Sequence, residues 1–205
     1  ERLDKLSNLV NPEKVIPSFM EFVDIAGLVK GAHSGEGLGN KFLSHIRETQ
    51  CFAHVIRCFE DENVIHVEGQ VSPINDLETI ETELILADLE VVSKRKESVQ
   101  KKLRSGDKTT QKEFDILEKI QDSLDNNKPV RDIDFEHNDK AFLKQLQLVT
   151  SKPFFFIANI HEDEQKNKHL AELEEYAKQH NLEILKVFAK AEGELIDLEE
   201  EERKE

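Results

Sequence analysis

The sequence predicts an α/β fold, with a doubly wound, mostly parallel sheet and an antiparallel α-helical hairpin inserted into it. Three observations support this fold class. Four short apolar runs have the length and composition of buried strands, helical patterns lie between or after them, and a long central stretch has no strand signal. Parallel strands need long connections, usually helices, so a repeat of strand and helix is typical of this class.

The predicted strands and helices follow one another along the chain. The strands, rich in Phe, Val and Ile, are residues 19–26, 52–59, 153–160 and 182–189. They lack a clean alternation of apolar and polar residues, which indicates strands covered on both faces. The helices are marked by apolar residues three or four apart: Leu38, Phe42 and Ile46, then Phe142 and Leu146, then Leu170, Leu173 and Ala177.

The central stretch predicts two helices. Its first part spaces apolar residues by three and four in turn, as in the seam of a coiled coil: Leu77, Ile80, Leu84, Ala87 and Val91. A turn at 105–107 follows, and then a second apolar stripe: Phe114, Leu117, Ile120 and Leu124. We expect residues 74–135 to be an insertion that divides an α/β domain into residues 1–73 and 136–205.

Composition excludes several classes of protein. The 205-residue chain has 28 basic and 43 acidic residues, a net charge of −15, which disfavours a protein that coats nucleic acid, and we expect no DNA partner. The longest apolar run, 154–158, is far shorter than the roughly 18 residues of a membrane span, so we expect no membrane partner. Cys51 and Cys58 would lie on opposite faces of a strand, and we interpret them as unpaired, buried thiols of a cytoplasmic protein.

One segment departs from this acidic average. Residues 94–112 carry eight basic side chains and two acidic ones. A solvated helix face accounts for such a run, and so does a contact with a polyanion such as RNA. The candidates for that contact are Lys94, Arg95, Lys101, Lys102 and Arg104.

The first predicted strand ends in a candidate nucleotide motif. Asp24 is followed three positions later by Gly27, and a glycine-rich loop comes next. An Asp at the end of a strand can hold a water on Mg²⁺, and a Gly N–H can approach a γ-phosphate without a side chain in the way. A structural turn accounts for this short motif equally well.

The loop itself strengthens the nucleotide interpretation. It contains five of the eight glycines of the chain, Gly27, Gly31, Gly35, Gly37 and Gly39, and such a segment can become ordered around a ligand. The phosphate-binding pattern GxxxxGK[ST] is absent from the sequence, because the nearest match, 35–41, has no hydroxyl residue after its Lys.

The third predicted strand ends in a second candidate motif. Asn159 ends the apolar run, and Glu162 lies three positions on. Guanine-specific proteins use Asn-Lys-x-Asp at this place, and here Ile160 and Glu162 replace the Lys and the Asp. Asn159 as a simple turn residue at the end of a strand is the alternative.

Several long segments, in the same order along the chain, resemble the YchF/Obg-like ATPase family, a branch of the TRAFAC-class P-loop NTPases. They are EFVDIAGLVKGAHSGEGLGNKFLSHIRE (21–48), HVIRCFEDENVIHVEG (54–69), INDLETIETELILADLE (74–90), KPFFFIANIHED (152–163) and VFAKAEGELIDLEEEERKE (187–205). The resemblance covers essentially the whole chain. It implies a GTPase-like G domain in two parts, 1–73 and 136–205, around the helical insertion.

The resemblance also implies roles for individual residues. The family prefers ATP because its fourth motif is NxxE, which Asn159 and Glu162 fill, with Ile160 against the nucleotide. The fifth-motif loop near the base would be Phe188, Ala189 and Lys190.

Asp24 and Gly27 would be the third motif, the start of switch II, with Asp24 holding Mg²⁺ through water. The family has an apolar residue, here Leu28, where Ras-like enzymes place the Gln that orients the attacking water. Its candidate replacement is a His in the loop after the next strand, and His66 has that position, although a lone His among Val and Ile is often structural.

Members of the family also begin with a GxxxxGKS loop and a Thr that ligates Mg²⁺, and they end with a TGS domain. The sequence contains none of these, so the resemblance predicts a central fragment with no useful ATP affinity or activity of its own, which calorimetry can check.

For the full-length protein, the resemblance implies a cytoplasmic, ribosome-associated ATPase that uses ATP with Mg²⁺ and is monomeric. Two alternatives remain at this point. One is a non-catalytic adaptor that binds ribosomal RNA through the hairpin, and the other is a GTP-specific relative.

Overall fold

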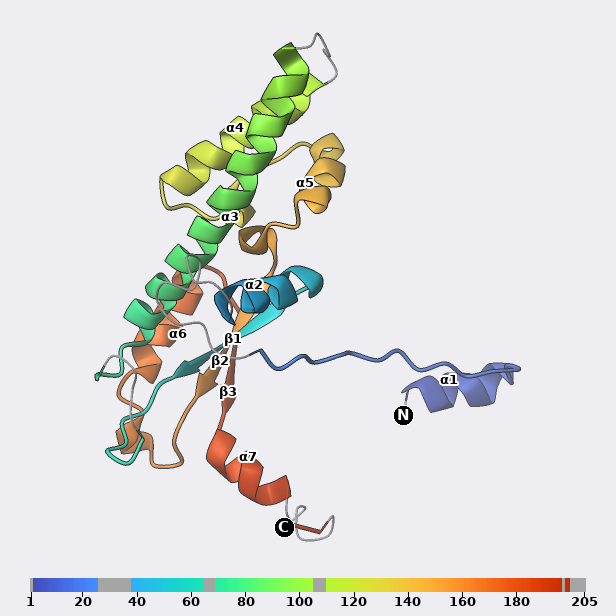
Figure 1. Cartoon of the computed structure of the whole chain (residues 1–205). Helices are drawn as coiled ribbons and strands as arrows, with labels where there is room; N and C mark the ends of the chain where they lie inside the picture. Colours follow the sequence, from blue (N-terminus) through green and yellow to red (C-terminus); the bar gives the residue numbers. More distant parts are fainter. Residues whose placement is uncertain (1, 26–37, 65–68, 105–109, 197, 200–205) are drawn as a thin grey trace.

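A computed structural model describes residues 2–25, 38–64, 69–104, 110–196 and 198–199. Its centre is a parallel sheet of three strands in the order β1-β2-β3 (Figure 1). The strands are β1 (Phe52–Arg57), β2 (Phe154–Asn159) and β3 (Ile184–Val187). Phe52 pairs with Phe154 and Arg57 with Asn159, so β1 and β2 begin and end together.

The helices surround this sheet or extend from it. They are α1 (Arg2–Val10), α2 (Leu38–Glu48), α3 (Pro73–Arg104), α4 (Gln111–Asp125), α5 (Lys140–Leu146), α6 (Leu170–Gln179) and α7 (Ala189–Ile196). Short 3-10 helices in the described residues include η2 (Val130–Asp132), η3 (His137–Asp139), η4 (Val149–Ser151) and η5 (Glu164–Lys166). In the described part of the chain, none of the helices combines the length and the apolar character needed to cross a bilayer.

Three of the four predicted strands are confirmed, but their predicted cover on both faces is not. The inner face packs on α3 and α6, where Leu77 and Leu173 contact Phe156 and its neighbours in a buried cluster. On the other face Val55 and Leu185 are exposed among the described residues. Burial along β1 therefore alternates, as in a strand with one covered face.

The predicted strand at 19–26 is wrong for its described residues. Residues 17–25 have no strand structure, and Phe19 is 90% exposed. An apolar run becomes a strand only when a neighbouring strand completes its hydrogen bonds, and the ladders of β1 and β2 include no residue of this segment. The segment instead leads away from the sheet to α1, which buries none of its residues (Figure 1).

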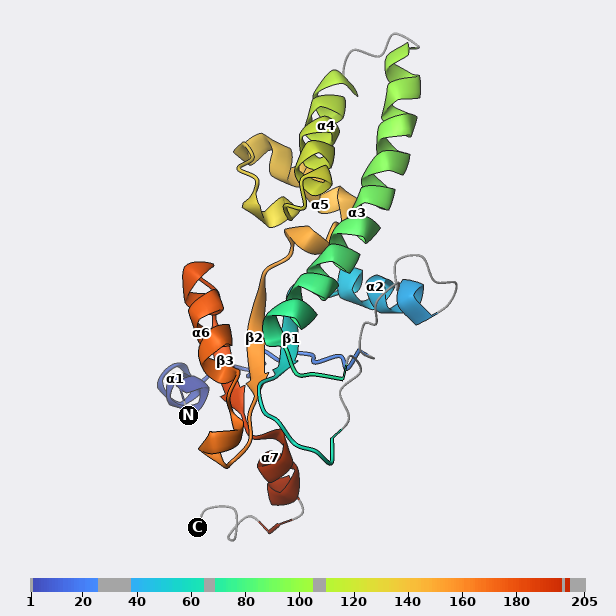
Figure 2. The ribbon, with the colours of Figure 1, turned by 90° about the vertical axis from the view of Figure 1, so that its left-hand side faces the viewer.

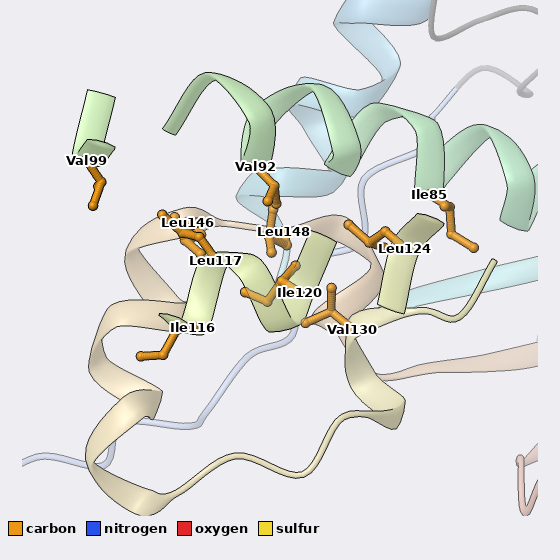
Figure 3. Packing of buried hydrophobic residues seen from close by; sticks show 10 residues of the cluster. All are labelled: Ile85, Val92, Val99, Ile116, Leu117, Ile120, Leu124, Val130, Leu146 and Leu148. Carbon is orange, nitrogen blue, oxygen red and sulfur yellow. The ribbon is translucent and has the colours of Figure 1, made fainter. Parts of the chain in front are cut away.

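The long helix α3 lies beside α4 (Figure 2) and has two apolar stripes. One stripe, Ile85, Val92 and Val99, packs on Leu117 and Ile120 of α4 (Figure 3). Most of the stripe predicted from the sequence instead faces the rest of the fold, although its last residue, Val91, packs against the cluster between α3 and α4. Its Leu77 packs on the sheet, and its Leu84 and Ala87 pack on α2.

A buried polar residue fixes α3 to the segment that enters β2. The Asp88 carboxylate is fully buried and accepts hydrogen bonds from the Val149 N–H at 3.0 Å and the Thr150 N–H at 2.8 Å. The Thr150 hydroxyl donates to it at 2.7 Å and accepts from the Val130 N–H at 3.2 Å. Burial raises the pKa of Asp88, and the bonds from Thr150 oppose that effect.

The C-terminal end of α2 is attached to the same segment. The Lys152 ammonium donates to the Arg47 carbonyl at 3.0 Å and to the Thr49 carbonyl, a favourable place for a cation at a helix C-terminus. Leu43 and Ile46 of α2 are buried against α3 and η4. The helix that follows the glycine-rich loop is thus packed directly on the base of α3.

The two cysteines differ in exposure. Cys58 is buried, as predicted, but Cys51 is exposed, because it precedes β1 on the edge that the described residues leave open. Both thiols are free.

Candidate nucleotide site

The carboxyl ends of the three parallel strands lie at one edge of the sheet, and the loops that follow them form the candidate site. β1 ends at Arg57, β2 at Asn159 and β3 at Val187. The Cys58 N–H donates to the Asn159 carbonyl at 2.9 Å and the Ile160 N–H to the Val187 carbonyl at 3.0 Å, so the three strand ends are joined. Ligands of open α/β sheets bind at this edge.

The fourth-motif residues separate into an inner and an outer part. Asn159 is partly buried at the end of β2, and Glu162 is exposed two residues beyond the buried core. Ile160 is 7% exposed and packs in the cluster with Leu77 and Leu173, so most of its surface is already covered by the core.

The fifth-motif residues lie at the junction of β3 and α7. Phe188 is 41% exposed, and its carbonyl accepts from the Glu192 N–H at 2.9 Å, which starts the first turn of α7. Ala189 and Lys190 are exposed in that turn. Their loop is next to the end of β2, because β2 and β3 are neighbours in the sheet.

The third-motif residues are described only in part. Asp24 is exposed and lies outside the sheet, and the next residue, Ile25, packs on the cluster formed by α2 and α3. Gly39 lies in the first turn of α2. Outside the described residues are Gly27, Leu28, Gly31, Gly35 and Gly37, as well as His66.

The loop after β1, which leads toward His66, is shaped by Arg57. Its guanidinium donates to the carbonyls of Phe59 at 3.0 Å, Val64 at 2.9 Å and Asp61 at 3.2 Å. It also lies 4.7 Å from the centre of the Phe59 ring. No local pattern predicts an arginine that binds three carbonyls of its own loop, so the sequence did not suggest Arg57.

Two carboxylates of this loop have lowered pKa values. The pKa of Glu60 is lowered mainly by its hydrogen bond with Lys168, with His169 adding to the effect. The pKa of Asp61 is lowered mainly by the Asn63 N–H, which donates to its carboxylate at 2.9 Å. Both loop carboxylates are therefore held in the charged form.

The structure describes Asp24, the residue predicted to hold Mg²⁺ through water. Its exposed carboxylate has the chemistry to hold a metal-bound water. Within the described ranges, no three His, Cys, Asp or Glu side chains are grouped as a metal site.

The basic residues of α3 fall into two groups. Lys94 pairs with Glu90 on its own helix, and Arg95 pairs with Glu113 of α4 at 3.5 Å. Lys101, Lys102 and Arg104 are exposed in the last turns of α3.

No protein-family model matches the chain. Two relatives named Ribosome-binding ATPase YchF are 49% identical over 207 residues, in Bacillus subtilis, and 45% identical over 205 residues, in Escherichia coli O157:H7. They cover 99% and 100% of this chain, which spans only 57% and 56% of their own lengths.

A solved structure agrees with these relatives. The YchF GTPase of Schizosaccharomyces pombe superimposes with a TM-score of 0.80 at 34% identity and covers 99% of this chain, which spans 57% of that protein. The relatives are thus named for ATP in two bacteria and for GTP in a yeast.

Proposed function

The chain belongs to the YchF/Obg-like ATPase family, and we propose on that basis that its full-length protein is a ribosome-associated, ATP-preferring P-loop NTPase. It hydrolyses ATP to ADP and phosphate as a translation-linked switch. The observation that carries this proposal is the edge of the sheet where the ends of β1, β2 and β3 meet. There Asn159, which Glu162 follows, pairs with Val187, the residue before the loop with Phe188 and Lys190.

The proposed mechanism assigns each motif one task. Asn159 and Glu162 hold the base, and the Phe188–Lys190 loop packs beside it. The Gly27 N–H senses the γ-phosphate, and His66 orders the attacking water in line with it. Mg²⁺, when bound with ATP, neutralises phosphate charge, and Asp24 holds part of its water shell.

We expect His66→Ala in the full-length protein to lower kcat for ATP about a hundredfold, the usual contribution of one positioned acid–base group. The KM for ATP should change little, because His66 acts on the water and not on the nucleotide. Steady-state release of phosphate measures both constants. His137→Ala, which removes an exposed histidine of η3, is the matched control.

The same assay separates the alternatives. Equal turnover in the wild type and His66→Ala would remove His66 from the mechanism. An absence of turnover in both would favour a non-catalytic adaptor that uses the helices for binding. Competition between ATP and GTP for the site decides whether this member is GTP-specific, as the name of the yeast relative suggests for that protein.

The ribosome contact is proposed for the exposed end of α3. Reversing the charges of Lys101, Lys102 and Arg104 to Glu should weaken binding to ribosomes about tenfold at moderate salt, because each cation that contacts a phosphate releases a counterion. Co-sedimentation with ribosomes at several salt concentrations measures the loss and its salt dependence.

Its control is a triple reversal elsewhere on the surface, at the exposed residues Lys128, Lys144 and Lys178. If both triple variants bind as the wild type does, the end of α3 has no role in ribosome binding. A loss in the control alone would place the contact on another face.

The same proposal includes the finer architecture. We interpret the sheet as part of a doubly wound G domain made of residues 1–73 and 136–205, and α3 and α4 as an antiparallel coiled-coil hairpin within residues 74–135. A monomer in the cytoplasm, without DNA or membrane partners, fits a factor that binds ribosomes.

A further inference from the structure

The residues on both sides of Glu162 are fixed by a single side chain. The Asn167 amide donates to the His161 carbonyl at 2.8 Å, and its oxygen accepts from the His161 N–H at 2.8 Å. One side chain therefore completes both backbone hydrogen bonds of His161, as a neighbouring strand would. The His161 carbonyl belongs to the peptide bond that enters Glu162, so the orientation of that peptide is fixed.

The residue after Glu162 is fixed as well. The Asp163 N–H donates to Nδ1 of His161 at 3.0 Å, and the Asp163 carboxylate caps η5 by accepting from the Gln165 N–H at 3.0 Å. Glu162 itself is exposed between these two anchored neighbours. The backbone that carries the Glu162 carboxylate therefore has little freedom left to lose when a ligand binds.

The loop of Asn167 is also attached to the loop after β1. The Glu60 N–H donates to the Lys166 carbonyl at 3.1 Å, and the Glu60 carboxylate pairs with Lys168 and lies 3.4 Å from Nε2 of His169. The Phe59 and His161 rings lie 5.8 Å apart. The loop is thus held by Asn167, which belongs to it, and by Phe59 and Glu60, which follow the end of β1.

We propose that Asn167 is a positioning residue that sets the base selectivity of the nucleotide site by fixing the peptide that carries Glu162. This inference rests on the proposed role of Asn159 and Glu162 in binding the base. Discrimination between adenine and guanine depends on where a few hydrogen-bond acceptors lie relative to the edge of the base. A small displacement of such an acceptor therefore removes much of the selectivity. Asn167 supplies that fixed position without touching the nucleotide.

The test measures the dissociation constants of ATP and GTP for the full-length protein and its variants, using fluorescent analogues of both nucleotides. Asn167→Ala should weaken the binding of ATP about tenfold and the binding of GTP much less, so that the ratio of the two dissociation constants approaches one. Asn167→Asp, which has the same shape but cannot donate to the His161 carbonyl, should narrow the ratio too. The kcat at saturating ATP should stay within about twofold of the wild type.

The matched control is Asn126→Ala. The Asn126 amide also donates to a backbone carbonyl, that of Asp122 at 2.7 Å, but at the end of α4 and away from the sheet. It should leave the ratio unchanged. If Asn167 has a purely structural role, its variants should bind ATP and GTP more weakly by the same factor and should melt at a lower temperature. That result would overturn the proposal.

A third variant distinguishes failure here from failure of the proposed function. Glu162→Ala should narrow the ratio at least as much as Asn167→Ala. If Glu162→Ala narrows it and both Asn167 variants leave it unchanged, the positioning role is wrong while the base motif stands. If Glu162→Ala has no effect, the base motif is wrong, and the role of Asn167 fails with it.

Discussion

Replacement of Asp88 with alanine is expected to lower the free energy of unfolding by about 3–5 kcal/mol, the range seen when one partner of a buried charged network is removed. The change leaves the Val149 and Thr150 N–H groups without their acceptor in a fully buried place. Each unsatisfied buried donor costs about 1–3 kcal/mol. Asp88 also connects α3 to the start of β2, so the loss affects both parts of the fold.

Urea-induced unfolding, followed by circular dichroism, measures this change. Asp88→Asn keeps the shape and one acceptor but places an amide donor against a backbone donor, so we expect about half the loss. Glu90→Ala is the matched control, since Glu90 lies on the same helix in an exposed pair with Lys94 and should contribute less than about 0.5 kcal/mol. A loss for Asp88→Ala as small as that of Glu90→Ala would show that water reaches the site.

Acidification between pH 6.5 and pH 4 is expected to cost about 3 kcal/mol of stability through His54 alone. Burial, assisted by the charge of Arg131, lowers the pKa of His54 from 6.5 to about 4. The folded protein holds this ring neutral while the unfolded chain would protonate it. The stability from His54 is therefore complete above pH 6.5 and is lost as the pH falls toward 4.

The position of His54 gives the physical reason. It lies on the inner face of β1, with its ring 6.3 Å from that of Phe156. A small cavity beside it is lined by Glu81, which pairs with Arg131, and by apolar side chains. Arg131 also lines this cavity, and its positive charge adds to the effect of burial in disfavouring an imidazolium at His54.

The measurement compares unfolding free energies at pH 7.5, 5.5 and 4.5 in the wild type and in His54→Gln, whose side chain does not titrate. The unfolding free energy of the variant should fall by about 3 kcal/mol less than that of the wild type over this pH range. Carboxylates contribute equally to both proteins, so the difference isolates His54. Parallel profiles would mean that the imidazole is protonated in the fold, contrary to its lowered pKa.

The sequence correctly predicted the elements whose apolar residues have a packing partner in the fold. β1, β2, β3, α2 and α6 were found because their apolar residues also meet a partner in the fold. The run at 19–26 has an equally strong apolar pattern but pairs with nothing among the described residues, and a pattern cannot supply the partner. For α3 the sequence showed one apolar stripe, of which Val91 packs against the cluster with α4, but it did not show the second stripe of Ile85 and Val92, which is buried in that cluster.

The candidate site was predictable only where a linear motif carries it. Asn159 and Glu162 were located from their spacing, and the structure places them at the edge of the sheet that such motifs use. Arg57 and Asn167 act on backbone groups of their own loops, and a hydrogen bond to a carbonyl leaves no signature in the sequence. The ion pairs of Lys94 and Arg95 were equally invisible in a count of charges.

The continuity of α3 has a mechanical consequence. The helix has 32 residues, so it is about 48 Å long, and its first half is packed on the sheet and on α2 while its last turns project beyond them (Figure 2). A rigid helix held along its first half moves most at its free end: a tilt of about 5° displaces the end of the remaining half, about 24 Å long, by about 2 Å. A tilt of α3 that followed α2 would therefore move Lys101 and Arg104 farther than the residues of α3 that pack on Leu43 and Ile46.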